Sequence, residues 1–133
     1  MKNYEILEHT ADLKIRAYGE NLEKVFSNFL KAMVEVCQPE IDSSSLISRK
    51  IQIKAESLES LLIDFLSEII YLMDVNKEIY TRAELMIKGN KLKGEIKGQK
   101  VKRFQTEIKA ATWHDLKIEK KDNLWTATVL FDI

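Results

Sequence analysis

Residues 58–74 have the sequence LESLLIDFLSEIIYLMD. Its apolar residues recur at three- and four-residue steps, which is the spacing of one face of an α-helix. Ser57 is a residue type that often caps a helix N-terminus, so the pattern predicts a helix from about Leu58 to Asp74. Ile63 and Ile70 widen the apolar stripe. A stripe this wide indicates that the helix packs across a sheet face or is buried from two sides.

A second helix is predicted upstream, from about Asn21 to Gln38, by the same apolar spacing. Asn21 is a plausible N-cap, and Pro39 marks the end of the helix. Cys37 is the single cysteine of the chain, so it has no internal disulfide partner. Because Cys37 lies on the apolar stripe, we expect a buried thiol and not a nucleophile.

The rest of the chain alternates between apolar and polar residues, as half-buried strands do. Gly89-Asn90 and Asp122-Asn123 separate pairs of such runs and predict tight turns. The order of elements predicts an α+β fold of two layers, in which a mainly antiparallel, mixed sheet packs with two α-helices. We expect a single domain over residues 1–133.

Two local expectations complete this outline. Residues 40–45 contain three consecutive serines and suggest a mobile loop. Residues 108–112 and 116–118 each alternate and suggest two separate strands.

Charge and hydropathy exclude several classes of protein. The chain has 21 basic and 21 acidic residues, and zero net charge argues against strong non-specific nucleic-acid binding without excluding a local basic patch. The opening MKNYEILEH lacks the apolar region of a signal peptide. No apolar run reaches the roughly 18 residues of a membrane span, so we expect a cytoplasmic protein without a membrane partner.

A polar cluster interrupts the first two strand patterns in LEHTADLKI, residues 7–15. Leu13 and Ile15 form the apolar phase of the second strand, so Asp12 falls on the opposite phase. Asp132 likewise alternates with Phe131 and Ile133 in the last strand pattern. Both aspartates therefore point away from the core, whereas Ile133 is expected on the core side.

If these two strands pair antiparallel, Asp12, Asp132 and the α-carboxylate of Ile133 meet. Three neighbouring carboxylates repel one another unless a cation or an extra proton compensates. An all-oxygen set suits a hard cation, Ca²⁺ or Mg²⁺, better than Zn²⁺. The alternative is that Asp12 caps a turn through its own backbone and that Asp132 is a solvated terminal residue.

Residues 109–115, KAATWHD, form a second candidate cluster. His9, Asp12, His114 and Asp132 are residue types that a small metal-dependent phosphohydrolase uses. No nucleophile motif or Gly-rich phosphate loop accompanies them. The alternative is that His114 makes local hydrogen bonds at a strand end.

A third candidate is the basic segment from Lys97 to Arg103, which Phe104 follows. Its four basic residues are suited to an RNA backbone or an acidic protein surface. The alternative is a solvated loop.

Four segments of the chain together resemble the archease family. They are HTAD (9–12), LLIDFLSEIIYL (61–72), KAATWHDL (109–116) and FDI (131–133). The resemblance covers nearly the whole chain, in the order and at about the length of that family. HTAD alone is weak, whereas the four segments together are specific.

The resemblance implies a protein cofactor and not an enzyme. Archease assists the tRNA-splicing RNA ligase of the RtcB type, promoting guanylylation of the ligase and multiple turnover. The implied partner is that ligase, and RNA is reached only indirectly through it. The implied metal is calcium, held at Asp12, Asp132 and Ile133, with Mg²⁺ or another divalent cation as alternatives. The oligomeric state does not follow from the resemblance.

The chain departs from the family at two positions near these segments. Lys14 stands where many members have glycine, and Ser57 stands where many have aspartate. Lys14 would bring a positive charge to the sheet edge beside Asp12, where it could weaken metal binding or partly replace the cation.

Overall fold

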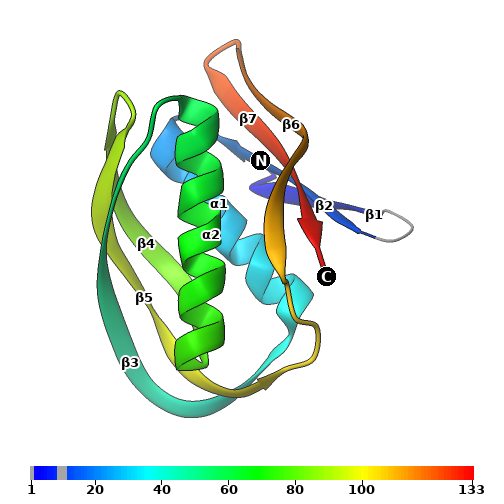
Figure 1. Cartoon of the computed structure of the whole chain (residues 1–133), viewed down its shortest axis with the longest axis vertical. Helices are drawn as coiled ribbons and strands as arrows, with labels where there is room; N and C mark the ends of the chain where they lie inside the picture. The colour runs from blue at the N-terminus through cyan, green and yellow to red at the C-terminus, as the bar shows by residue number, and fades with distance from the viewer. Residues whose placement is uncertain (1, 9–11) are drawn as a thin grey trace.

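The computed structural model describes residues 2–8 and 12–133. Within them the chain forms seven β-strands and two α-helices (Figure 1). Their bounds are β1 Tyr4–Glu8, β2 Leu13–Gly19, α1 Leu22–Cys37, β3 Pro39–Lys54, α2 Leu58–Asn76, β4 Glu78–Lys88, β5 Lys91–Phe104, β6 Ala110–Lys121 and β7 Leu124–Asp132.

The strands form two sheets, and each helix contacts strands of both. One sheet has the order β1-β2-β7-β6 and the other β3-β5-β4. All five pairings among the described strands are antiparallel. Figure 1 shows α2 beside the three-stranded sheet, with β6 and β7 on its other side. The α+β class is confirmed. The prediction of a single mixed sheet was wrong, because the structure has two antiparallel sheets. The alternation of apolar and polar residues does not say which strands pair.

Both helices begin at the predicted caps. The side chain of Asn21 accepts a hydrogen bond from the Lys24 N–H at 2.9 Å, and Ser57 accepts one from the Ser60 N–H at 3.0 Å. These bonds satisfy N–H groups that a helix start leaves without a partner. Helix α2 ends at Asn76, two residues beyond the predicted end, where Lys77 turns left-handed with φ 54°.

The core lies where the helices meet each other and the sheets. Phe26 of α1 packs on Phe65 of α2 with ring centroids 5.3 Å apart, and Phe29 packs on Phe131 of β7 at 6.3 Å. Cys37 is fully buried, as predicted, and burial raises the pKa of its thiol to about 11. The thiol therefore stays protonated at neutral pH, as expected for a packing residue.

The loop expected at residues 40–45 was wrong, because this segment belongs to β3. Its ladder to β5 is irregular there: Ile41 lies opposite Val101, and Leu46 lies opposite Gln99. The three serines thus fall in a bulged part of a long strand. The pairs on either side of the serines, at Ile41 and Leu46, keep the segment within β3 despite the preference of serine for loops.

The two strands expected at 108–112 and 116–118 are one strand, β6, with a bulge inside it. Thr112 pairs with Leu130 and Lys117 with Thr128, so β6 takes five steps where β7 takes two. Asp115 has φ 54° within this bulge. The predicted turns are confirmed: Gly89-Asn90 joins β4 to β5, and Asp122-Asn123 joins β6 to β7.

Candidate metal site

Strands β2 and β7 are neighbours, which was the condition for a site shared between them. Their antiparallel register runs from Gly19 opposite Trp125 to Leu13 opposite Phe131. Asp12 immediately precedes Leu13 and Asp132 immediately follows Phe131, so extending the register by one step would set the two aspartates opposite each other. The two aspartates therefore lie at one end of the same pair of strands.

The backbone of Asp132 is held from the other side by the segment that leads into β6. Asp132 lies opposite Ala110, and its carbonyl oxygen accepts a hydrogen bond from the Lys109 N–H at 2.8 Å. Ile133 follows the last strand residue and is 44% exposed. The core position expected for Ile133 was wrong, because β7 ends at Asp132 and its burial pattern stops there.

The two aspartates lie on the face of the sheet that turns away from the helices. Leu13 and Phe131, their chain neighbours, are buried at 7% and 0% exposure. Asp12 is half-buried and Asp132 is exposed. This alternation is the one predicted from the sequence, and it gives both carboxylates access to solvent.

The predicted ligand set of Asp12, Asp132 and Ile133 contains oxygen donors only. Over residues 2–8 and 12–133, no group of three or more His, Cys, Asp or Glu side chains gathers as a metal centre. The predicted set instead joins two side chains, Asp12 and Asp132, to the α-carboxylate of Ile133. Carboxylates are the donors that Ca²⁺ and Mg²⁺ prefer, and Cys37 lies buried in the core. The residues present therefore fit a hard cation.

Lys14 is the next residue of β2 on the same face as Asp12. It lies between Leu7 of β1 and Leu130 of β7. Two strand residues span roughly 6.6 Å, so the Lys14 backbone is close to the aspartate pair. A lysine there adds positive charge at the edge of the candidate site.

The arrangement does not favour the phosphohydrolase alternative. His9 lies outside the described residues, and Ala110, not His114, lies opposite Asp132. His114 is four residues further along β6, inside the bulge between Thr112 and Lys117. Its side chain is 71% exposed, and its Nε2 lies 3.3 Å from the Asp115 carboxylate. His114 thus makes the local contact that the alternative interpretation predicted.

The basic segment at 97–103 is a strand and not a loop. It belongs to β5, the central strand of its sheet. Three of its four basic residues have acidic partners: Lys97 with Glu84 and Glu95, Lys100 with Glu78, and Arg103 with Glu40. These ion pairs reduce the net positive charge of residues 97–103. The segment alone therefore does not form a basic RNA-binding site.

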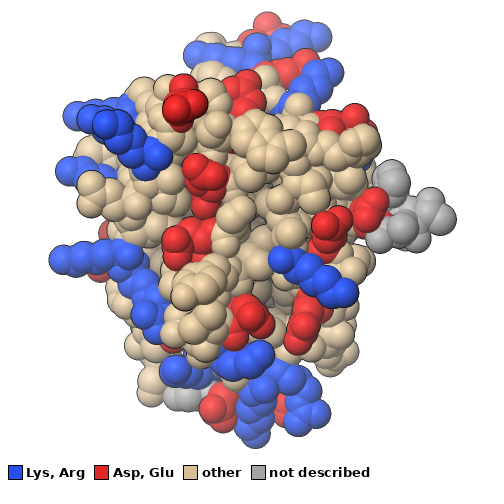
Figure 2. All heavy atoms as spheres, viewed as in Figure 1, with Lys and Arg blue, Asp and Glu red and all other residues tan. Residues whose placement is uncertain are grey.

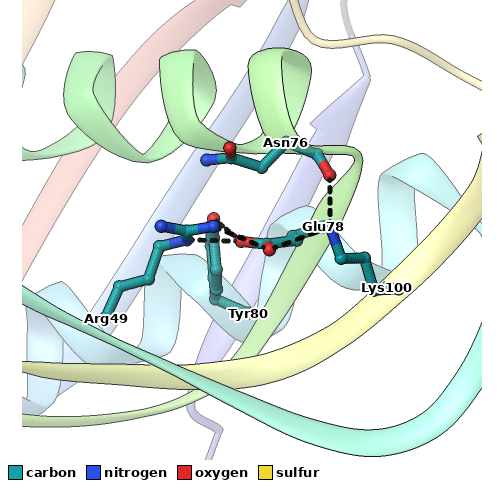
Figure 3. Close-up of polar contacts among 5 residues, drawn as sticks. All are labelled: Arg49, Asn76, Glu78, Tyr80 and Lys100. Atoms are coloured by element: carbon teal, nitrogen blue, oxygen red, sulfur yellow. Dashed lines mark hydrogen bonds and ion pairs between the residues drawn. The ribbon is translucent and has the colours of Figure 1, made fainter.

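A buried ionic cluster around Glu78 was missed by sequence reasoning (Figure 3). Glu78 is 1% exposed and accepts hydrogen bonds from Arg49 Nε at 2.6 Å and Nη2 at 2.9 Å. It also accepts one from the Tyr80 hydroxyl at 2.7 Å, and Lys100 Nζ lies 3.7 Å away. The hydrogen bonds from Arg49 lower the pKa of Glu78 below its ordinary 4.5. Burial raises the pKa of Tyr80, and the bond to Glu78 raises it further.

The Glu78 cluster ties the end of α2 to its sheet. Lys100 Nζ also donates to the carbonyl oxygen of Asn76, at 3.4 Å, in the last turn of α2. Every partner is a side chain or carbonyl of this chain, so the cluster is an internal brace and not a vacant binding site. Arg49, Glu78 and Lys100 come from three different strands, so no local sequence motif predicts that they are in contact.

Comparison with known proteins decides the family. Residues 4–133 match the model of the archease protein family. The chain belongs to the archease family. The archease of Methanosarcina mazei is 39% identical over 99% of this chain and 97% of its own length. The archease of Pyrococcus abyssi is 37% identical over the full length of both chains.

Solved structures agree with the archease fold described above. Protein 1598 of Methanobacterium thermoautotrophicum superposes with a TM-score of 0.75 at 28% identity, covering all of both chains. An archease from Thermotoga maritima, described as a possible chaperone, superposes with a TM-score of 0.72 at 24% identity. It covers 96% of this chain and 94% of its own. Neither helix of the described structure is long and apolar enough to cross a membrane.

Proposed function

We propose that this archease-family protein is a cofactor protein that activates an RtcB-type RNA ligase in tRNA splicing or RNA repair. It promotes guanylylation of the ligase and multiple turnover, and it has no catalytic residue of its own. A divalent cation, calcium or alternatively magnesium, binds at Asp12, Asp132 and Ile133. The ligase is the direct partner, and the setting is the cytoplasm.

The observation that supports this proposal is the β2–β7 register, which sets Asp12 opposite Asp132 when it is extended by one step. Two carboxylates brought together at a sheet end would repel each other, and a bound cation would offset that repulsion. Family membership adds the expectation that this end of the sheet is functional.

Strands β2 and β7 and the residue before β6 position the carboxylates of the candidate metal site. Strands β2 and β7 fix the backbone positions of Asp12 and Asp132, and the Lys109 N–H holds the carbonyl of Asp132. Asp12, Asp132 and the α-carboxylate of Ile133 would hold the cation, which would supply the positive charge that offsets their repulsion. Asp12 is half-buried and Asp132 is exposed, so these carboxylates would present the site to the ligase.

The test is a multiple-turnover RNA ligation assay with the cognate ligase. Asp12→Asn and Asp132→Asn keep the side-chain size and remove the charge. Each is expected to lower the activated turnover by about tenfold or more, because losing a ligand disables a cation site. Asp64→Asn removes one charge from the exposed face of α2 and is the matched control.

Single-turnover ligation by already guanylylated ligase is expected to stay unchanged with either site variant. If Asp12→Asn and Asp132→Asn activate as well as the wild type, the site assignment fails. If the wild-type chain also gives no activation, the proposed function itself fails.

A further inference from the structure

The outer face of the three-stranded sheet carries an excess of positive charge. In β3, β4 and β5, buried or half-buried residues alternate with residues that point away from the helices. We call the outward residues the basic sheet face. They are Ser48, Lys50, Gln52, Lys54, Arg82, Glu84, Met86, Lys88, Lys91, Lys93, Glu95 and Lys97. Seven are basic and two acidic, so the face carries +5 in a chain whose net charge is zero.

The cross-strand register concentrates this charge at the hairpin end of the sheet. Lys54 lies opposite Lys91, which lies opposite Lys88, so three lysines form one row. The next row contains Lys93 of β5. Like charges directly opposite each other destabilise a sheet. Among the described residues, none of these four lysines has an acidic partner within ion-pair distance.

Protection of sheet edges does not explain the whole arrangement. Lysines on edge strands discourage pairing with other chains. This effect explains Lys54 on β3 and Lys88 on β4, which are the edge strands of the sheet. It does not cover Lys91 and Lys93, which lie on the central strand β5. The repulsion on the central strand therefore points to an external anion.

Helix α2 and the three-stranded sheet differ in charge. Helix α2 contains four acidic residues and no lysine or arginine. Figure 2 shows blue side chains projecting at the left margin, where the three-stranded sheet lies in Figure 1, and red side chains running down the middle over α2. A polyanion is thus attracted to the sheet and repelled by the helix.

The composition of the basic sheet face indicates which class of partner it binds. Cores of protein–protein interfaces are enriched in aromatic residues and depleted in lysine, whereas this face has lysines and no aromatic residue. Nucleic-acid interfaces are more polar and more positive. Without an aromatic stacking platform, contact is confined to phosphates and carries no sequence information.

We propose that the basic sheet face binds the phosphodiester backbone of RNA directly and without sequence preference. The choice of RNA over DNA rests on the proposed function. The expectation that RNA is reached only through the ligase is thereby replaced by a direct contact at Lys54, Lys88, Lys91 and Lys93. One depression beside the exposed Met86 is lined by all four of these lysines, whereas its neighbour is lined by Lys50 and Lys93 together with Glu84 and Glu95.

The test measures binding of a fluorescein-labelled single-stranded RNA to the full chain by fluorescence anisotropy, from about 50 to 200 mM salt. The wild type is expected to bind with a log–log salt slope of about −3, the value for four phosphate contacts with a single strand. Lys91→Glu with Lys93→Glu should weaken binding at least about tenfold, and the neutral pair Lys91→Gln with Lys93→Gln should lower the slope by about 1.4.

The matched control is Lys31→Glu with Lys121→Glu, which makes the same change in net charge at exposed positions off the face. It should change affinity by less than about threefold. Circular dichroism checks that each variant is folded. The proposal falls if the wild type does not bind RNA at low salt, if both charge-reversal pairs weaken binding equally, or if a polyglutamate peptide binds more tightly than RNA.

The ligation assay separates this proposal from the proposed function. If Asp12→Asn abolishes activation while the RNA titration shows no binding, the proposed function stands and the basic sheet face is wrong as an RNA site. If RNA binds through the basic sheet face but the wild-type chain does not activate the ligase, the basic sheet face stands as an RNA site and the proposed function is wrong.

Discussion

At the scale of single residues, Glu78 holds a charge inside the molecule because three donors surround it. Arg49 supplies two hydrogen bonds and Tyr80 a third, and the pKa of the carboxyl group falls below 4.5. A carboxylate buried at 1% exposure would otherwise be strongly disfavoured. The cluster therefore stabilises the fold only while Glu78 is ionised.

This leads to a prediction about stability and pH. Because the folded-state pKa of Glu78 is lowered, its stabilisation is present above the unfolded-state pKa, near 4.5, and is lost as pH falls through the folded-state value. At pH 7, Glu78→Gln should cost about 3 kcal/mol or less, since Arg49 and Lys100 keep access to solvent. Urea unfolding of both proteins across this pH range measures the difference.

The difference between wild type and Glu78→Gln should shrink as pH falls below about 4.5. Glu20→Gln, at an exposed position, is the control and should change stability by less than about 0.5 kcal/mol. A cost of Glu78→Gln that stays constant down to pH 3 would show that the charge of Glu78 is not what stabilises the cluster.

At the scale of elements, the approach of β4 to β5 depends on glycine. A Cβ atom on Gly98 would lie 1.7 Å from the Ile79 carbonyl oxygen and 2.8 Å from the Tyr80 Cα. The β4–β5 register shifts between Tyr80 and Arg82, immediately beside this contact. Gly98 thus allows the backbones to pass closely where Glu78 and Tyr80 enter the ionic cluster.

Gly98→Ala is therefore expected to destabilise the protein by about 3 kcal/mol, because the backbone of β4 must move away. Thermal unfolding followed by circular dichroism measures the change. Ser48→Ala, at an exposed position of β3 in the same sheet, should have little effect. An unchanged melting temperature for Gly98→Ala would contradict the close approach.

The elements differ in how well the sequence predicted them. The caps at Asn21 and Ser57 and the turn at Asp122-Asn123 were predictable because their signals are local. The strand at 40–45 and the continuous β6 were not, because pairing with β5 and β7 outweighs local preference. The alternation of apolar and polar residues correctly predicted that Asp12 and Asp132 lie off the core. The same alternation predicted a core position for Ile133, which was wrong because the strand ends before it.

At the scale of the whole molecule, two functional surfaces are proposed on different sheets. The carboxylate end belongs to β2 and β7 of the four-stranded sheet, and the basic sheet face belongs to the three-stranded sheet. Zero net charge conceals this division, since it sums over the whole chain. The lysines became recognisable as one surface only when the register aligned Lys54, Lys88 and Lys91.

Calcium titration by isothermal calorimetry measures whether Asp12 and Asp132 share one cation. Metal-free wild-type protein should bind about one Ca²⁺ per chain, and Asp12→Asn and Asp132→Asn should each weaken binding at least about tenfold, whereas Asp64→Asn should not. Magnesium titrated in the same way shows which cation the site prefers. Equal calcium binding by the wild type and both site variants, or no binding of either cation by the wild type, would contradict a shared cation site.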